Sequence, residues 1–500
     1  MLKLKLVPQS VVLTVITVVL CLAPLYLVES KASAGSPIFP IAMCSNVNIF
    51  TNQAYVPKII DAGARMVRID FSFRSIRPKE GADPNQWNWV ELDKVRALRG
   101  QFPQLKWLVL LGYGAAWAED PKFAKIQGDG FAGGERGVNI MPAESPDNLY
   151  GNYVYETVRR YKDVVDCFES WNEPDLPGHP FFKGNGRDFF PYQRACYLAA
   201  KKADPKCTVL FAGQTFANIE GYMHAHGLKP PTLSPAPSSF FEEYLQECVK
   251  DPAAKAHNYY FDVMAQHSYS RATDLFDYVD IDRAMMRTYL KEEKPVWITE
   301  YGFPAVPGSP WGGTEDEYCD YLLQSFAWGK LAGVERFFQF QLDNSNGLGL
   351  YEAMLGNPRK ALNTYKNVLV KQFADADFVA QLHGNRGVGF LAGNSPYVPT
   401  WQKGYDLFEF KSNDGKRRIL MAFTDTSKKM EVSVPAKKAS ATLINRDGEQ
   451  STISAVNGAY KILLAGATNA AGYPIDPNPE AKAMGQPEHL VGGATQIIVE

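Results

Sequence analysis

Two glutamates that accompany apolar segments are the residues of this sequence with the clearest chemical potential. Glu173 lies in the stretch FESWNEP at 168–174, and Glu300 lies in VWITEYG at 296–302. Cleavage of a glycosidic bond requires two facing carboxyl groups, of which one donates a proton to the leaving oxygen and the other, ionised, attacks the anomeric carbon. The sequence therefore predicts this chemistry, provided that the fold brings two distant parts of the chain together.

The elements that must position these glutamates recur with some regularity. Eight short apolar segments, most of them separated by stretches long enough for a helix, lie at 38–45, 64–71, 105–113, 164–171, 208–214, 261–267, 296–299 and 336–342. They predict an α/β fold, a (β/α)8 TIM barrel over residues 35–370, with 359–370 as the eighth helix. Because such barrels form their active sites at the carboxyl ends of the strands, the fourth and seventh strands would bring Glu173 and Glu300 to one central cleft.

The last part of the chain has a different pattern. Short alternating segments at 405–411, 418–423, 431–434, 441–444, 460–464 and 495–500 are separated by turns such as Asn-Asp-Gly at 413–415. They predict a C-terminal β-sandwich accessory domain over 371–500. Tyr397 and Trp401 admit a carbohydrate-binding role for this domain, but a packing platform for the barrel is the favoured interpretation.

The first residues are typical of an export signal. Lys3 and Lys5 precede an apolar run at 11–28 that Pro24 interrupts, and Ala-Ser-Ala follows at 32–34. We expect residues 1–34 to be a signal peptide cleaved after Ala34, which implies a secreted, periplasmic or extracellular protein with no stable membrane insertion. The alternative is an uncleaved membrane anchor.

Composition excludes some other classes of function. Lys plus Arg number 52 and Asp plus Glu 54, and no basic stripe is evident, so we expect no nucleic-acid partner. The six cysteines that remain after the signal are widely spaced, which favours buried thiols with at most one bridge. The seven histidines are scattered, so the sequence predicts no metal site and no cofactor.

Several motifs carry a family resemblance. WNEP at 171–174 and ITEYG at 298–302 resemble the fourth- and seventh-strand motifs of the retaining clan A glycoside hydrolases, which are (β/α)8 barrels. MVRIDFS at 66–72, HSY at 267–269 and NGLGL at 346–350 resemble further parts of these enzymes. The layout is most similar to the branch that contains β-xylosidases, α-iduronidases and bacterial exopolysaccharide endoglycosidases. The resemblance covers about residues 38–370.

The resemblance implies roles for individual residues. Glu173 would be the general acid/base, and Glu300 the nucleophile of a covalent glycosyl-enzyme. Asn172 would bind the sugar 2-hydroxyl, an interaction that strengthens as charge develops at the anomeric centre. Partial burial and the charge of Glu300 would favour the protonated form of Glu173. Glu169 lies inside the strand and is interpreted as a paired structural carboxylate.

Five further residues are candidates for the substrate site. Arg68 would lie beside Glu300 and keep it ionised, or else pair with Asp70 or Asp175. His267 would lie near Glu173, either in contact with substrate or behind it. Tyr269 would orient Glu300, unless it only closes the barrel rim. Trp117 is a candidate sugar platform with core packing as an equal alternative, and Trp311 is a weaker one.

The sequence departs from the family pattern at two places. Many members have a histidine after the third strand, where this chain has Tyr113. Many also have a tryptophan at the end of the eighth strand, where residues 338–341 read Phe-Gln-Phe-Gln. Gln339 or Gln341 would be the alternative contacts there. These departures leave the identity of the sugar open.

The resemblance thus implies a retaining glycoside hydrolase that cleaves O-glycosidic bonds of a polysaccharide or oligosaccharide by double displacement. The long loop after the fifth strand, including 229–235, favours endo-action. An exo-acting, β-xylosidase-like enzyme is the alternative within this class. A non-catalytic polysaccharide-binding or assembly protein on a barrel scaffold is the alternative outside it.

Overall fold

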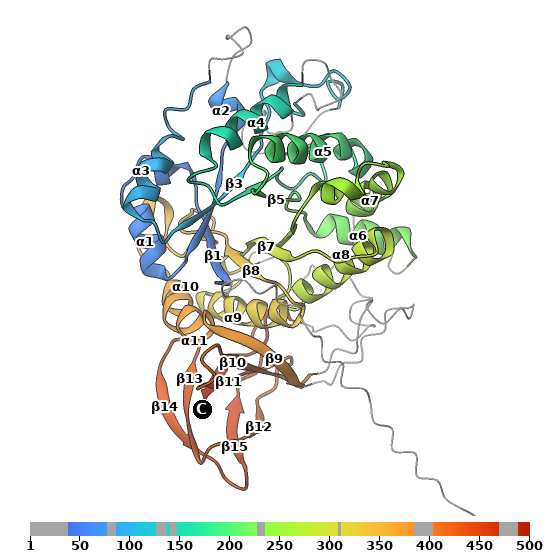
Figure 1. Ribbon diagram of the computed structural model, residues 1–500. Helices are drawn as coiled ribbons and strands as arrows, with labels where there is room; N and C mark the ends of the chain where they lie inside the picture. The colour runs from blue at the N-terminus through green and yellow to red at the C-terminus, as the bar shows by residue number, and fades with distance from the viewer. Residues whose placement is uncertain are drawn as a thin grey trace, which may run out of the picture. The chain divides into compact units, whose positions relative to one another are not determined.

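Eight short parallel strands form the centre of the protein, as the computed structural model shows (Figure 1). The structure describes residues 39–77, 87–126, 138–140, 148–227, 236–308, 312–384, 404–469 and 489–500. The strands are β1 (Ile41–Cys44), β2 (Met66–Asp70), β3 (Lys106–Leu110), β4 (Cys167–Glu169), β5 (Thr208–Leu210), β6 (Met264–Ser268), β7 (Val296–Tyr301) and β8 (Arg336–Gln339). Each overlaps one of the eight predicted segments. Strands β6 and β7 extend beyond their predicted ends, so that Glu300 lies within β7 rather than after it.

The sheet closes on itself. Its strand order is β5-β4-β3-β2-β1-β8-β7-β6, and parallel bridges Leu210–Val263 and Gln214–Gln266 join the two edge strands. The predicted (β/α)8 barrel is confirmed. Closure is what brings the ends of β4 and β7 to the same rim.

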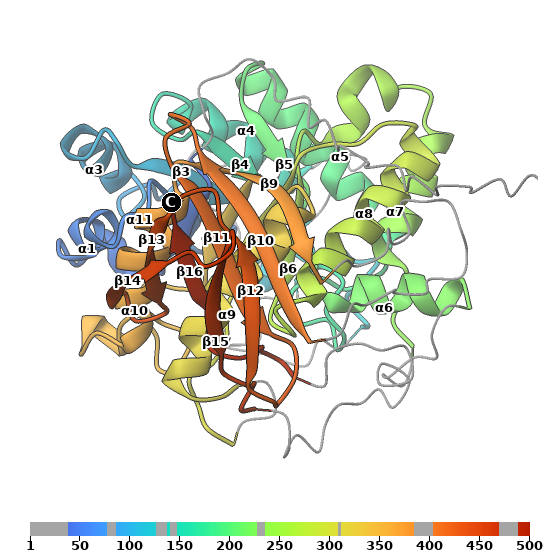
Figure 2. The same cartoon turned by 90° about the horizontal axis from the view of Figure 1, so that it is seen from below.

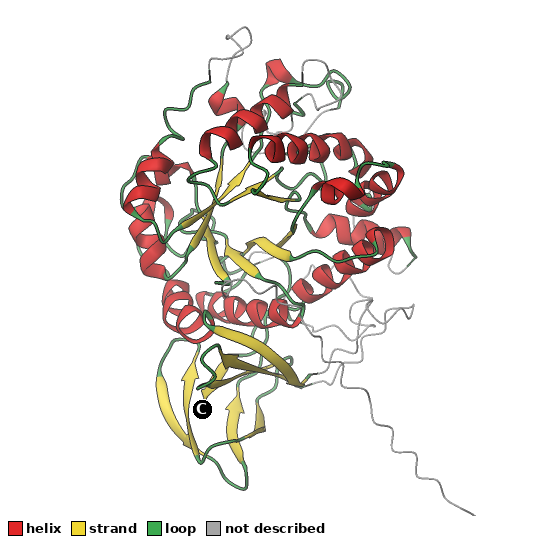
Figure 3. Ribbon diagram, viewed as in Figure 1, coloured by secondary structure: helices red, strands yellow, loops and turns green. Residues whose placement is uncertain are grey.

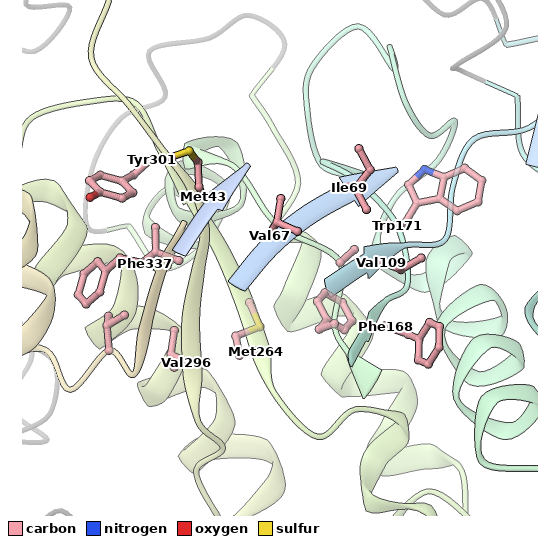
Figure 4. Packing of buried hydrophobic residues seen from close by; sticks show 14 of the residues in the cluster. Met43, Val67, Ile69, Val109, Phe168, Trp171, Met264, Val296, Tyr301 and Phe337 are labelled. Atoms are coloured by element: carbon pink, nitrogen blue, oxygen red, sulfur yellow. The ribbon is translucent and has the colours of Figure 1, made fainter. Parts of the chain in front are cut away.

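The strand residues pack on both faces of the ring. One set, including Met66, Leu108, Trp297 and Phe338, fills the interior of the barrel as a separate apolar cluster. The alternate set faces outward into the main core, as Figure 4 shows for Val67, Val109, Phe168 and Phe337. The interior of the barrel is therefore a packed core, which confines chemistry to the end of the barrel where the carboxyl ends of the strands lie.

The helices surround the strands (Figure 3). They are α1 (Tyr55–Ala62), α2 (Phe73–Ile76), α3 (Lys94–Gln101), α4 (Leu149–Tyr161), α5 (Gly186–Ala203), α6 (Phe216–Ala225), α7 (Phe240–Lys250), α8 (Asp274–Leu290), α9 (Glu315–Leu331), α10 (Lys360–Asn363) and α11 (Lys371–Phe373). Short turns add η1 (Val47–Phe50), η2 (Ala116–Ala118), η3 (Lys255–Tyr260), η4 (Ala353–Leu355) and the π-helical η5 (Thr364–Val370). The predicted eighth helix is thus α10 and η5, which α11 extends.

The C-terminal region is antiparallel, as predicted. It contains β9 (Ala376–His383), β10 (Tyr405–Ser412), β11 (Arg418–Thr424), β12 (Met430–Pro435), β13 (Ser440–Asn445), β14 (Gln450–Ser454), β15 (Ala459–Leu464) and β16 (Gln496–Val499). Six strands form one sheet in the order β14-β13-β16-β11-β10-β9, and β12 pairs with β15. A third apolar cluster, which includes Leu420, Val434 and Ile462, lies between them. Strands β9 and β14 were not among the predicted segments.

Helix α9 lies between the barrel strands and the sandwich (Figure 1 and Figure 2). Its Trp328 ring lies edge-on to Phe408 of β10 at 5.2 Å, and Phe326 stacks on Phe410 at 6.2 Å. The amide of Gln324 donates to the Gly493 carbonyl and accepts from the Gly492 N–H. Residues Ile38–Glu500 accordingly form one compact unit.

Some predictions concern residues outside the described ranges. The residues concerned are the signal segment 1–34, the segment 229–235, Trp311, Tyr397 and Trp401. Within the described residues, no helix is both long enough and apolar enough to cross a bilayer. The cysteines Cys44, Cys167, Cys196, Cys207, Cys248 and Cys319 are all buried, and none of them forms a disulfide in this structure.

Candidate active site

Arg68, in β2, is the centre of a buried cluster near the carboxyl ends of the barrel strands. Its Nε donates to Glu169 Oε2 at 2.5 Å, its Nη1 to Glu300 Oε1 at 2.6 Å and its Nη2 to Asn172 Oδ1 at 3.0 Å. The carboxylates that accept from Arg68 are therefore Glu300, which was expected from sequence, and Glu169. Neither is Asp70 or Asp175, the alternatives considered from sequence. One planar guanidinium with several donors thus connects β2 with β4, the segment that follows β4, and β7.

The carboxyl group of Glu300 is held ionised against the effect of its burial. Burial alone raises its pKa, but the charges of His267 and Arg68 and a hydrogen bond from the Tyr269 hydroxyl keep the pKa below its ordinary value. Arg68 donates to one oxygen and Tyr269 to the other. A carboxylate with both oxygens oriented in this way is suited to nucleophilic attack.

Glu173 follows β4 in a backbone conformation that is rare for a residue with a side chain. Its φ is 40°, in the left-handed region, where strain of about 1–3 kcal/mol is characteristic of functional positions. Its N–H donates to the Gly213 carbonyl at 2.8 Å, and its own carbonyl accepts from the Leu176 N–H at 3.2 Å. The flanking backbone therefore maintains the turn that directs this carboxyl group.

His267, in β6, lies between the two glutamates. Its Nδ1 is 2.9 Å from Glu173 Oε1 and 3.7 Å from Glu300 Oε2. Burial alone lowers the pKa of His267, but the charge of Glu300 and the contact with Glu173 raise it above its ordinary value. One oxygen of each glutamate and one His267 nitrogen lie within 4.8 Å of one another. The two carboxyl groups thus share one site.

A bulge in β7 explains how Thr299 and Glu300 both reach this site. Gln266 pairs with Ile298, whereas His267 pairs with Glu300, so Thr299 is an extra residue between them. Successive residues of a regular strand face opposite sides, and a bulge re-aims one of them. Thr299 Oγ1 donates to Glu169 Oε1 at 2.9 Å and is 3.1 Å from His267 Nε2.

Sequence reasoning assigned no role to Thr299. A polar residue next to the catalytic candidate, at the end of the apolar run Val-Trp-Ile, was the available signal. Its meaning depends on the bulge, which follows from how β6 and β7 pair and not from the residues of β7 alone.

Asn172 and Tyr269 lie at the same cluster. Asn172 is buried, and because its carbonyl oxygen accepts from Arg68, its amide N–H groups are directed elsewhere. Tyr269 lies edge-on to Phe340 at 5.9 Å, at the end of β8 where many clan members have a tryptophan. Gln339 is fully buried and donates to the Tyr318 hydroxyl at 2.6 Å, so its amide nitrogen has a partner inside the fold.

Trp117 is not part of this cluster. Its indole N–H donates to the Arg77 carbonyl at 3.1 Å, and its ring packs 5.6 Å from Phe73 and 5.2 Å from the Arg77 guanidinium. These contacts support the packing alternative, and the sugar platform stays a prediction. Tyr113 packs on Phe181 at 5.7 Å in a small apolar cluster.

Glu173, His267 and Glu300 are close enough to share a cation. However, Arg68 and Tyr269 already donate to the two oxygens of Glu300, and both His267 nitrogens have hydrogen-bond partners. A metal ion would also lie beside the Arg68 guanidinium and be repelled by its charge. We therefore interpret the three side chains as a proton-transfer cluster.

Comparison with known families agrees with this geometry. Residues 206–365 match the family model of the glycosyl hydrolase catalytic core. The matched segment contains β5 to β8 and therefore His267, Thr299 and Glu300. A comparison with curated protein sequences finds no match.

Solved structures with the same fold include several glycoside hydrolases. A family 39 glycoside hydrolase from Bacteroides cellulosilyticus WH2 aligns with a TM-score of 0.58 and 15% identity over 93% of this chain and 81% of its own. A family 39 β-xylosidase from Caulobacter crescentus aligns with 0.53 and 14% over 94% and 98%. A family 30 endoxylanase from Clostridium papyrosolvens C71 aligns with 0.53 and 11% over 94% and 97%. These structures share the (β/α)8 barrel of this chain, and the likeness shows the fold.

Proposed function

We propose that the protein is a retaining glycoside hydrolase that cleaves O-glycosidic bonds of a polysaccharide or oligosaccharide. The match to a glycosyl hydrolase catalytic core supports glycosidase activity. The observation that carries the mechanism is the spacing of the carboxyl groups, whose facing oxygens lie within 4.8 Å of each other. Retaining enzymes place these groups about 5–5.5 Å apart, whereas inverting enzymes need about 6.5–9.5 Å to admit a water molecule.

The proposed reaction has two steps. A Glu300 oxygen forms a bond to the anomeric carbon while the glycosidic bond breaks, and the leaving oxygen takes the proton of Glu173. Water then attacks the anomeric carbon and gives a proton to the Glu173 carboxylate, and the ester electron pair returns to Glu300. Arg68 and Tyr269 orient the nucleophile, and the Asn172 amide would donate to the sugar 2-hydroxyl.

The proposal also covers whether the enzyme cleaves within chains or at their ends, and in which compartment it acts. We favour endo-action outside the cytoplasm, on the basis of the Pro-rich segment 229–235 between α6 and α7 and the signal-like segment 1–34. An exo-acting, β-xylosidase-like enzyme is the alternative. Solved structures with this fold have names that include both an endoxylanase and a β-xylosidase.

Product analysis on a panel of exopolysaccharides, hemicelluloses and aryl glycosides tests this function. We expect the wild type to release oligosaccharides, and Glu300→Gln and Glu173→Gln to lose about 10²–10⁴-fold or more of this activity. Glu91→Gln, which changes an exposed glutamate on the outside of the barrel, is the matched control and should be fully active. Release of monosaccharides only would indicate exo-action. A wild type that binds glycans but cleaves nothing in the panel would show a non-catalytic binding protein.

A further inference from the structure

The hydroxyl of Thr299 connects Glu169 with His267. It lies 2.9 Å from Glu169 Oε1 on one side and 3.1 Å from His267 Nε2 on the other. Thr299 and Glu169 are fully buried. The connection uses Glu169 Oε1, whereas Arg68 donates to the other oxygen, Oε2.

The number of hydrogens available fixes the direction of these two bonds. Glu169 forms an ion pair with Arg68 and therefore accepts hydrogen bonds without donating any. The one hydrogen of the Thr299 hydroxyl then points to Glu169, and a lone pair of its oxygen remains for His267. His267 Nε2 must carry a hydrogen to complete the bond. This tautomer is assigned from the network.

The other ring nitrogen then faces the proposed acid. His267 Nδ1 is 2.9 Å from Glu173 Oε1. With a hydrogen already on Nε2, a single further proton joins the two groups, either on Glu173 or on Nδ1. The opposite neutral tautomer, with its hydrogen on Nδ1, would donate to Glu173 and stabilise it as a carboxylate that has no proton to give.

Local packing restricts the His267 ring to this arrangement. A Cβ at Gly213 would lie 2.1 Å from Nε2, so the backbone that follows β5 approaches this nitrogen closely. The bulge in β7 provides the Thr299 hydroxyl, which contacts the same nitrogen. The charged groups around the ring are Arg68 from β2, Glu173 after β4 and Glu300 from β7, with Glu169 beyond Thr299.

We propose that Thr299 and Glu169 are positioning residues that keep a hydrogen on Nε2 of His267, so that Glu173 and His267 share one proton and act together as the acid/base. This inference rests on the proposed glycosidase function. In the first step the shared proton passes to the leaving oxygen, which leaves the Glu173 carboxylate facing the bare Nδ1. In the second step the attacking water returns one proton to the pair.

Kinetics of Thr299→Val and Thr299→Ser test this role, because valine keeps the shape and serine keeps the hydroxyl. In Thr299→Val we expect the alkaline limb of the kcat/KM profile to move to lower pH by about one unit, with a loss of about tenfold at neutral pH. The loss should appear for substrates with poor leaving groups and vanish for dinitrophenyl glycosides, which need no acid. Thr299→Ser should resemble the wild type. Equal effects of valine and serine, or a loss that is independent of the leaving group, would overturn the proposal.

Nitrogen NMR of 15N-histidine-labelled full-length protein tests the same point without turnover. The chain has seven histidines, and His267→Gln assigns the relevant signals. At neutral pH we expect a hydrogen on Nε2 of His267 in the wild type, and a neutral ring with its hydrogen on Nδ1 in Thr299→Val. A wild-type ring with a bare Nε2 refutes the positioning role. Absence of turnover together with the expected spectrum would instead refute the glycosidase function alone.

Discussion

At the scale of residues, the candidate site holds more negative than positive groups. Glu169 and Glu300 both contact the single guanidinium of Arg68. Glu173 contacts His267 Nδ1, which also lies 3.7 Å from Glu300 Oε2. Removal of Arg68 would leave two buried carboxylates without their principal counter-ion, which is expected to be strongly destabilising.

A second buried carboxyl group affects stability rather than catalysis. Asp282, in α8, is fully buried, and its Oδ2 has no hydrogen-bond partner among the described residues. Burial, with a contribution from the charge of Asp175, raises its pKa well above the ordinary value. The folded protein therefore binds a proton that the unfolded chain releases above about pH 4, so stability falls as the pH rises from there toward the folded-state pKa.

We predict that Asp282→Asn stabilises the protein at pH 8 by about 1–3 kcal/mol, because the buried group can no longer ionise. The gain should be smaller at pH 5, where less of the wild-type stability has been lost. Denaturant unfolding at both pH values measures this difference. A variant that is less stable than the wild type at both pH values would contradict the interpretation of Asp282 as a buried acid.

At the scale of elements, the barrel could be predicted from sequence and the details of its rim could not. The eight strands were recognisable because apolar runs such as Trp107–Leu111 in the third are buried on both faces. The bulge at Thr299 and the left-handed turn at Glu173 depend on the pairing of β6 with β7 and on the carbonyl of Gly213. These are contacts between segments distant in the chain, which no local pattern records.

Gly213, in the segment that follows β5, gives a test at this scale. We predict that Gly213→Ala displaces the His267 ring, since the added Cβ would lie 2.1 Å from Nε2, and lowers kcat/KM by about 10²-fold for substrates that need an acid. Gly112→Ala is the matched control, because a Cβ there meets nothing within 4 Å. Thermal unfolding checks that both variants fold. A fully active Gly213→Ala would show that the close approach of Gly213 to the His267 ring has no function.

At the scale of the whole molecule, α9 packs against both the barrel and the sandwich. It lies between the barrel strands and the sandwich, and every residue from Glu317 to Gly329 is buried. Buried polar groups are shared as well, since Asp320 accepts from the Thr495 N–H and pairs with Arg446 at 2.5 Å. The boundary predicted at residue 371 therefore divides one compact unit.

We predict that a chain ending at residue 374 is insoluble or unfolded. It would expose Phe326, Trp328 and Phe373, each contributing about 1.5–3 kcal/mol of burial, and would leave Asp320 and Gln324 without partners. Expression and size-exclusion chromatography beside the full chain measure the outcome. A soluble, fully active truncated barrel would contradict the packing-platform interpretation and favour an independent accessory domain.

The most direct test of the central claim is covalent trapping of the nucleophile. An activated 2-deoxy-2-fluoro glycoside of an accepted sugar should inactivate the protein and add one glycosyl group to the peptide that contains Glu300, as measured by peptide mass spectrometry. Glu300→Gln should not be labelled. A label on any other carboxylate, or hydrolysis with inversion at the anomeric carbon, would contradict the assignment of Glu300 as the nucleophile of a retaining reaction.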